Sequence, residues 1–317
     1  MAMSGAMKAL ALTGYDGPAS LRFVDLPIPE PGPNDVLVEV RAASVNPIDG
    51  KITHGYLRGR VELAFPHVLG RDGAGVVAKV GGAVTGFAPG DEVFGVADQA
   101  RWGTQAEYVA IPAATLARKP AGLGHIEAGS LPVAGLSALA GLETVGQIAR
   151  GQKVLVHAGA GGVGSFAVQL AKHLGATVAA TAGTANLDFV RALGADVVID
   201  YTRTDFAGAI KDYDLVFDLI GGEVRYRSFR VLKPGGAIVH ISVPPMTQPA
   251  PRDDVAVKPA PVKYDTALLD RISALVESRA VRPVVGAVYP FADALEAFAH
   301  VMTGHARGRT MLDMGIN

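Results

Sequence analysis

Residues 153–174 read KVLVHAGAGGVGSFAVQLAKHL, and this stretch decides the fold of the second half of the chain. Lys153 to His157 form a short strand candidate, and Val163 to Leu174 follow with the apolar spacing of a helix. The GxGxxG pattern between them lets the backbone turn tightly and approach a pyrophosphate at the helix N-terminus. The predicted cofactor contacts in this loop are Gly159, Ala160, Gly161, Gly162, Val163 and Gly164.

The surroundings of the loop decide how much this pattern means. In a chain with 39 glycines the alternative is a glycine-rich turn without a ligand. Further strand candidates at 177–181, 197–199, 214–218 and 237–242 alternate with a helix candidate at 187–193. Such alternation is typical of a parallel sheet covered on both faces, so we expect an α/β, doubly wound, Rossmann dinucleotide-binding domain over residues 129–262. After residue 242 the prolines at 244, 245, 249, 251, 259 and 261 predict a long loop.

The rest of the chain has a different character. Short, partly alternating runs such as residues 36–41, 75–80, 92–94 and 107–111 are separated by Gly and Pro, which predicts a compact β-rich, barrel-like domain over residues 1–128. Residues 264–279 and 291–302 read as amphipathic helices with a β-like run at 284–288 between them. We expect this tail, residues 263–317, to complete the first domain.

Composition and charge narrow the classes of partner. The net charge is −1, which provides no electrostatic reason to expect nucleic acid or an anionic membrane surface. The absence of cysteine excludes disulfides and thiolate zinc ligands. Residues 154–171 are uncharged, but four glycines within them argue against a membrane-spanning helix. The expectation is a soluble, cytoplasmic protein that binds small molecules.

The choice between NADH and NADPH depends on the segment after the second strand. An NAD site usually presents a carboxylate there for the ribose hydroxyls. Residues 181–186 contain none, and the first acid, Asp188, already belongs to the next helix. Arg191 lies a further turn along, so the strong cation expected for a 2′-phosphate is missing. Small polar side chains leave room for that phosphate, so we favour NADPH, with contacts from Thr181, Gly183, Thr184 and Asn186.

Several segments, in order, carry a family resemblance. They are SVNPID at 44–49, LGRDGAGV at 69–76, PGDEV at 89–93, the glycine loop, LGAD at 193–196 with IDY at 199–201, and LKPGG at 232–236. Together they resemble the medium-chain dehydrogenase/reductase superfamily, and within it the zinc-free quinone oxidoreductase (zeta-crystallin-like) branch, over nearly the whole chain after Met7. The resemblance implies a GroES-like catalytic domain and a Rossmann domain, an active site in the cleft between them, and a homodimer.

The same segments, which we call the family markers, indicate whether the site holds a catalytic zinc ion. Zinc-dependent relatives carry Gly-His-Glu where this chain has Gly70, Arg71 and Asp72, and a cysteine near the position of Asn46. The eight histidines form no convincing ligand spacing, so we expect no catalytic zinc. Quinones and enones suit a metal-free site, because they accept hydride at an electron-poor carbon and the resulting delocalised oxyanion needs only hydrogen-bond donors.

Two residues of the first marker are the catalytic candidates. Asn46 is the predicted hydrogen-bond donor to substrate or nicotinamide ribose, and a turn residue before Pro47 is the alternative. Asp49 would orient Asn46 or a water molecule, or else act as a helix-start carboxylate. The quinone reductase branch often has a tyrosine two residues later, where this chain has Lys51, so its substrate specificity is not carried over.

Further cofactor contacts follow from the resemblance. Ser137 matches a residue that approaches the nicotinamide in relatives, with a small packing residue as the alternative. Tyr201 matches a contact to the 2′-phosphate, with packing as the alternative. The residues that end two predicted strands and should border the nicotinamide half are Gly221, Gly222, Ser242 and Val243.

These observations predict an NADPH-dependent reductase of a quinone or α,β-unsaturated carbonyl compound. An enoyl-thioester reductase is the alternative within enzymes, although no basic cluster for a carrier phosphate is visible in the sequence. A catalytically silent NADPH-binding sensor or structural protein is the alternative outside them.

Overall fold

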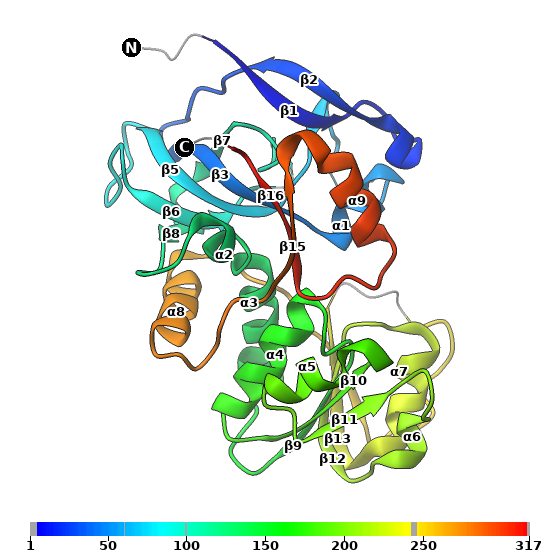
Figure 1. The fold of residues 1–317 in the computed structure, drawn as a ribbon. Helices are drawn as coiled ribbons and strands as arrows, with labels where there is room; N and C mark the ends of the chain where they lie inside the picture. Colours follow the sequence, from blue (N-terminus) through cyan, green and yellow to red (C-terminus); the bar gives the residue numbers. More distant parts are fainter. Residues whose placement is uncertain (1–4, 60, 99, 242–245, 316–317) are drawn as a thin grey trace. The chain divides into compact units, whose positions relative to one another are not determined.

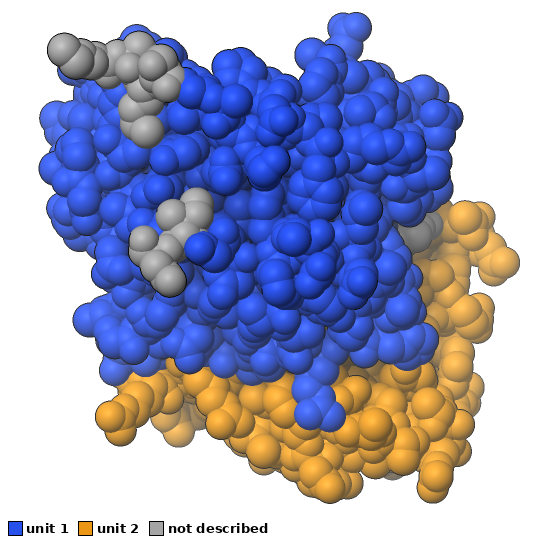
Figure 2. Space-filling model, turned by 45° about the horizontal axis from the view of Figure 1, so that its top comes forward, with its two compact units in different colours: residues 1–133, 264–277, 283–317 blue, residues 134–263, 278–282 orange. Residues whose placement is uncertain are grey.

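The computed structural model describes residues 5–59, 61–98, 100–241 and 246–315. The chain forms two compact units, residues 1–133, 264–277 and 283–317 in one, and residues 134–263 and 278–282 in the other (Figure 2). The division falls after residue 133 because the segment up to it is tied to the first unit. The Val133 amide donates to Asp72 at 2.9 Å, and a Cβ on Gly129 would lie 3.0 Å from the Ala74 nitrogen.

The first unit is built on β-sheets (Figure 1). A seven-stranded sheet runs in the order β15-β16-β3-β5-β6-β8, with β7 also paired to β3, and a smaller sheet has the order β2-β1-β4. The strands of the first unit are β1 (Ala6–Leu12), β2 (Leu21–Pro27), β3 (Asp35–Val45), β4 (His67–Val68), β5 (Asp72–Val80), β6 (Glu92–Val96), β7 (Tyr108–Pro112), β8 (Leu116–Arg118), β15 (Val285–Pro290) and β16 (Arg309–Asp313). This is the GroES-like β domain that the resemblance predicts.

The C-terminal tail is part of that sheet. β16 pairs antiparallel with β3, with Thr310 opposite Val45, which brings Arg309 beside the segment that follows β3. The helices of this unit are α1 (Pro47–Thr53), α2 (His125–Gly129), α8 (Thr266–Glu277) and α9 (Ala294–Met302).

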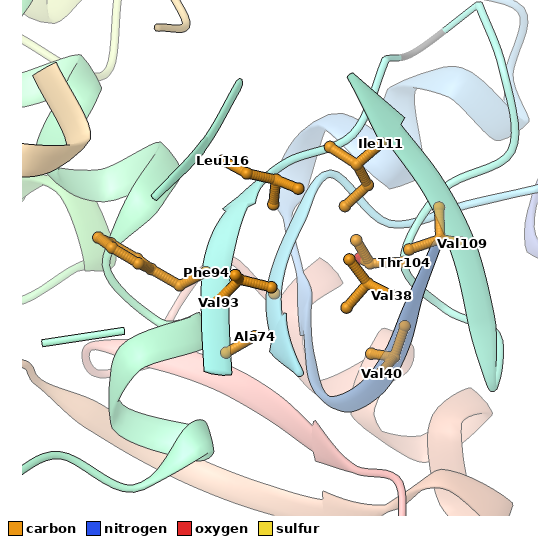
Figure 3. A pocket seen from close by; sticks show the side chains of 10 residues that line it. Val38, Val40, Ala74, Val93, Phe94, Thr104, Val109, Ile111 and Leu116 are labelled. Atoms are coloured by element: carbon orange, nitrogen blue, oxygen red, sulfur yellow. The ribbon is translucent and has the colours of Figure 1, made fainter. Parts of the chain in front are cut away.

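The interior of this β domain is a packed core. Val38, Val109 and Ile111 point into the space that the strands enclose (Figure 3). The space left among these side chains is about 10 Å³, room for one water molecule at most. This part of the interior therefore stabilises the unit and offers no room for a substrate.

The second unit contains one six-stranded sheet, parallel throughout. Its order is β11-β10-β9-β12-β13-β14, which corresponds to the strand order 3-2-1-4-5-6 of dinucleotide-binding domains. The strands are β9 (Lys153–Val156), β10 (Thr177–Ala182), β11 (Val197–Asp200), β12 (Tyr213–Asp218), β13 (Leu232–His240) and β14 (Ala256–Pro259). The helices are α3 (Pro132–Leu139, which begins in the first unit), α4 (Gly162–His173), α5 (Leu187–Ala192), α6 (Phe206–Ala209) and α7 (Gly222–Ser228). The predicted α/β, doubly wound class is confirmed.

One prediction about this sheet is wrong. Residues 256–259 lie in the segment predicted as a proline-rich loop, yet they form the edge strand β14. An edge strand tolerates a proline, because only one side of it enters the hydrogen-bond ladder. Among the described helices, none is long and apolar enough to span a membrane.

Candidate active site

The glycine loop joins β9 to α4, and its glycines have two different tasks. A Cβ on Gly164 would lie 2.0 Å from the Ala158 oxygen, and one on Gly159 would lie 2.8 Å from the Ala180 Cβ, so both allow strand and helix to pack closely. The nearest atom to a Cβ on Gly161 is 3.4 Å away. Gly161 is the N-cap of α4 and provides no side-chain cap, so the first helical turn keeps amide donors for an anion.

A buried histidine holds this loop in place. His157 Nε2 lies 2.9 Å from Ser228 Oγ, and its Nδ1 lies 3.1 Å from Thr181 Oγ1. Ser228 donates its hydroxyl hydrogen to the Val224 oxygen at 2.7 Å, so it accepts from His157, and Nε2 carries the proton. Thr181 then donates to Nδ1 and accepts the Ala158 amide at 3.2 Å. The chain of bonds joins the glycine loop to α7.

This network requires a neutral imidazole. Burial lowers the pKa of His157 to about 4, while the nearby Asp218 carboxylate raises that pKa and Arg227 lowers it further. Thr181, predicted as a cofactor contact, is buried with its hydroxyl inside this network. These bonds help to position the glycine loop, and a contact between Thr181 and the cofactor stays a prediction.

The next corner lies where β10 and β11 end side by side, with Ala182 paired to Asp200. Thr184, a predicted contact, donates its hydroxyl to Asp200 at 2.6 Å. The hydroxyl of Tyr201 would lie 3.5 Å from a Cβ on Gly183, so these two predicted residues are neighbours. The predicted contact Asn186 follows in a short turn, where its amide bonds to the Gly183 oxygen at 2.8 Å.

Asp200 is not among the predicted site residues. The predicted carboxylate position follows β10, whereas Asp200 comes from the end of β11. The signal was available, because the IDY marker places an acid directly after an apolar strand and neighbouring parallel strands end at the same edge.

The end of β12 forms a second anchored turn. The Asp218 carboxylate accepts the amides of Ile220 and Gly221 at 2.9 and 2.8 Å, and Nε of the buried Arg225 at 2.7 Å. Gly221 has a φ of 80°, which favours glycine, so this predicted residue lies in a tight, fixed turn. Ser137 is buried on α3. The predicted contacts Ser242 and Val243 lie outside the described residues.

The catalytic candidates of the first unit lie together at the start of α1. Asn46 is the N-cap of this helix, and its backbone N–H donates to the Asp49 carboxylate at 2.8 Å. Asp49 thus has the helix-start role that the sequence analysis left open. Burial, opposed by this hydrogen bond, raises the pKa of Asp49 to about 7.

Asn46 is only 2 % exposed, and both polar atoms of its side-chain amide are hydrogen-bonded to other side chains. Its Nδ2 donates to Ser44 at 2.8 Å and to Asp72 at 3.0 Å, and its Oδ1 accepts from Arg309 at 2.5 Å. Arg309 also makes two bonds to the buried Asp72 carboxylate, at 2.8 and 3.0 Å. The sequence analysis missed Arg309, because 263 positions separate it from Asn46 and nothing local indicates the contact.

These residues do not fit a zinc ion. Asn46 is a neutral amide, Arg71 is a cation, and the Arg309 guanidinium already satisfies the Asp72 carboxylate. Zinc instead requires thiolate, imidazole or free carboxylate ligands. Within the described part of the chain, no group of three or more His, Cys, Asp or Glu side chains could hold a metal ion.

Comparison with known proteins places the chain in a family. Residues 32–121 match the model of the alcohol dehydrogenase GroES-like domain, and residues 193–312 match a zinc-binding dehydrogenase model. An NADPH-dependent alkenal/one oxidoreductase of Arabidopsis thaliana chloroplasts is 37 % identical over 321 residues, which cover 96 % of this chain and 79 % of that protein. The chain belongs to the medium-chain dehydrogenase/reductase superfamily, in its quinone oxidoreductase-like branch.

Other relatives have the same character. A 2-methylene-furan-3-one reductase of Solanum lycopersicum is 36 % identical over 318 residues, which cover 96 % of this chain and 79 % of that protein. The solved quinone oxidoreductase of Coxiella burnetii superposes with a TM-score of 0.89 at 34 % identity, over 98 % of this chain and all of the other. The protein is therefore an oxidoreductase of this family.

Proposed function

We propose that this protein is a metal-independent, NADPH-dependent reductase that delivers hydride to a quinone or an α,β-unsaturated carbonyl compound. The observation that carries the proposal is the network of Asn46, Asp72 and Arg309. It stands at the markers where zinc-dependent relatives carry their ligands, and its carboxylate and amide are already bonded to a guanidinium.

The second unit fits a nicotinamide dinucleotide. The uncapped first turn of α4 offers amide donors to a pyrophosphate, and His157 holds the loop that precedes it. The turn fixed by Asp218 and the buried Ser137 are the described candidates for the nicotinamide half. When bound, NADPH supplies the hydride.

The acceptor class follows from the residues of the network, which do not fit an electrophilic metal because the Asp72 carboxylate is already bonded to Arg309. A simple ketone needs a strong electrophile or acid to stabilise its developing alkoxide, whereas a quinone or enone spreads that charge over a conjugated system. Three of the relatives bear names that refer to an alkenal or alkenone, a methylene-furanone and a quinone, all conjugated carbonyl compounds. We further propose a cytoplasmic homodimer.

The test is NADPH oxidation by the purified protein against a panel of quinones, enones and simple ketones, with NADH and EDTA as controls. Turnover that prefers NADPH, favours conjugated acceptors and ignores EDTA is the expected result. Turnover of enoyl thioesters alone would favour the enoyl-thioester reductase. NADPH binding without turnover of any acceptor would favour a silent binding protein.

A further inference from the structure

The corner where β10 and β11 end contains one carboxylate and one guanidinium. Asp200 is the last residue of β11, and the chain then turns. The backbone N–H groups of Arg203 and Thr204 donate to the backbone carbonyl oxygen of Asp200 at 3.1 and 2.9 Å. Tyr201 is half exposed on this turn. In a dinucleotide-binding sheet the adenosine ribose lies near the end of the second strand, which is β10 here. Both charges therefore lie close to the position expected for the adenosine ribose of a bound dinucleotide.

The carboxylate of this corner is shielded and satisfied. Asp200 Oδ2 accepts the Thr184 hydroxyl at 2.6 Å, and Oδ1 accepts the amide and hydroxyl of Thr202 at 3.0 and 2.7 Å. These bonds lower the pKa of Asp200, so it is anionic at neutral pH. Its side chain is only 10 % exposed. Little of its hydrogen-bonding capacity is left for a ribose hydroxyl.

The guanidinium, by contrast, faces solvent. The Arg203 side chain is 76 % exposed, and its Nε lies 3.8 Å from Asp200 Oδ2, beyond hydrogen-bond distance. An exposed ion pair of this kind contributes little, so the side chain can turn toward a stronger anion. A phosphate offers one, because a guanidinium binds it with two parallel hydrogen bonds.

We propose that Arg203 is the residue that selects the 2′-phosphate of NADPH over the free ribose hydroxyl of NADH. The inference rests on the proposed function and names the cation that the sequence analysis found missing. The other basic residue considered there, Arg191, is paired with Asp188 on α5 at 2.6 Å. Thr184 and Tyr201 lie at the same corner as Arg203, whose Nε is 3.8 Å from the Asp200 carboxylate.

The experiment measures binding without any acceptor. Adenosine 2′,5′-bisphosphate and AMP differ only in the 2′-phosphate, and calorimetry with both isolates the contribution of that group. The wild type should bind the bisphosphate more tightly, with an advantage that decreases as salt is added. Arg203→Gln should weaken bisphosphate binding about tenfold and change AMP binding by less than about twofold. Arg203→Lys should retain part of the preference, because it keeps the charge but loses the planar pair of donors.

Two variants provide the controls. Arg191→Gln removes a nearby exposed arginine that is bonded to Asp188, and it should bind both nucleotides as the wild type does. Asp200→Asn removes the negative charge beside Arg203, so it should keep or strengthen bisphosphate binding. Thermal unfolding of each variant checks that it is folded.

The opposite results would overturn the inference. If Arg203→Gln kept the full bisphosphate preference, another group would recognise the phosphate, and the reductase proposal would remain. If the wild type preferred AMP and Asp200→Asn lost that binding, the corner would be a ribose-hydroxyl site for NADH. Equal loss of both nucleotides in Arg203→Gln would contradict a selective role.

Discussion

Two regions use polar residues in opposite ways. One is the buried network of the first unit, and the other is the dinucleotide edge of the second unit, formed by the first turn of α4 and the turn that contains Arg203. Around Asn46, Asp72 and Arg309, the carboxylate and amide groups are bonded to other side chains and buried. At the dinucleotide edge, the first turn of α4 has no side-chain cap and Arg203 projects into solvent. We therefore propose that the network holds the shape of the first unit, whereas the first turn of α4 and Arg203 contact the cofactor.

The largest effect is expected from breaking the network. Arg309→Met would leave the buried Asp72 carboxylate without its cation, and such uncompensated charges cost about 3–5 kcal/mol. Chemical denaturation should show this loss in the free energy of unfolding. The exposed Arg203→Gln is the matched arginine control, with wild-type stability expected. Similar stabilities for the two variants would contradict the scaffolding role.

The pH dependence of stability should separate the two regions. The pKa of His157 is lowered from 6.5 to about 4, so the unfolded chain binds more protons, and this group destabilises the fold as pH falls through that window. The pKa of Asp49 is raised from 3.8 to about 7, so the folded chain binds more protons, and this group destabilises the fold as pH rises. The two contributions oppose each other between pH 4 and 6.5.

Single variants should reveal each contribution. Asp49→Asn leaves the His157 dependence, so its stability should increase with pH by about 1 kcal/mol per unit across this window. His157→Gln leaves the Asp49 dependence and should show the opposite slope. Denaturation midpoints measured at several pH values give both slopes. Parallel curves for the two variants would mean that at least one group does not titrate as its burial predicts.

The glycine loop allows a smaller and more local test. Gly164→Ala places a Cβ 2.0 Å from the Ala158 oxygen, and overpacking of this kind costs about 1–3 kcal/mol of stability. Gly161→Ala meets no atom closer than 3.4 Å, so it should fold normally but bind NADPH more weakly, because its Cβ obstructs the approach of the pyrophosphate. Equal stability of the two variants would remove the distinction between packing and ligand glycines.

The sequence predicted best what is encoded locally. The glycine loop, the strands around it and the order of the family markers lie in short segments whose spacing carries the signal, and the structure confirms the α/β class from them. β14 was missed because Pro259 and the other prolines of the surrounding segment indicate a loop, and only its pairing with β13 makes it a strand.

Contacts between distant segments were the harder part of the site. Asn46 was chosen for its chemistry, but its amide is bonded to Ser44, Asp72 and Arg309, the last from the far end of the chain. Asp200 and Arg203 are not among the predicted site residues, because they lie at and after the end of β11, whereas the predicted contacts were drawn mainly from the segment after β10. In both cases a strand pairing brings together residues that the linear sequence separates.

Whether this oxidoreductase works without a metal can be decided by measuring turnover and bound zinc in the same samples. Preparations stripped with chelator, untreated and incubated with excess zinc should be assayed with NADPH and one active quinone or enone, and their zinc content determined by elemental analysis. If the enzyme is metal-independent, turnover per chain should be equal in all three preparations, with far less than one zinc per chain in the stripped sample. Turnover that rises in proportion to bound zinc would contradict metal independence.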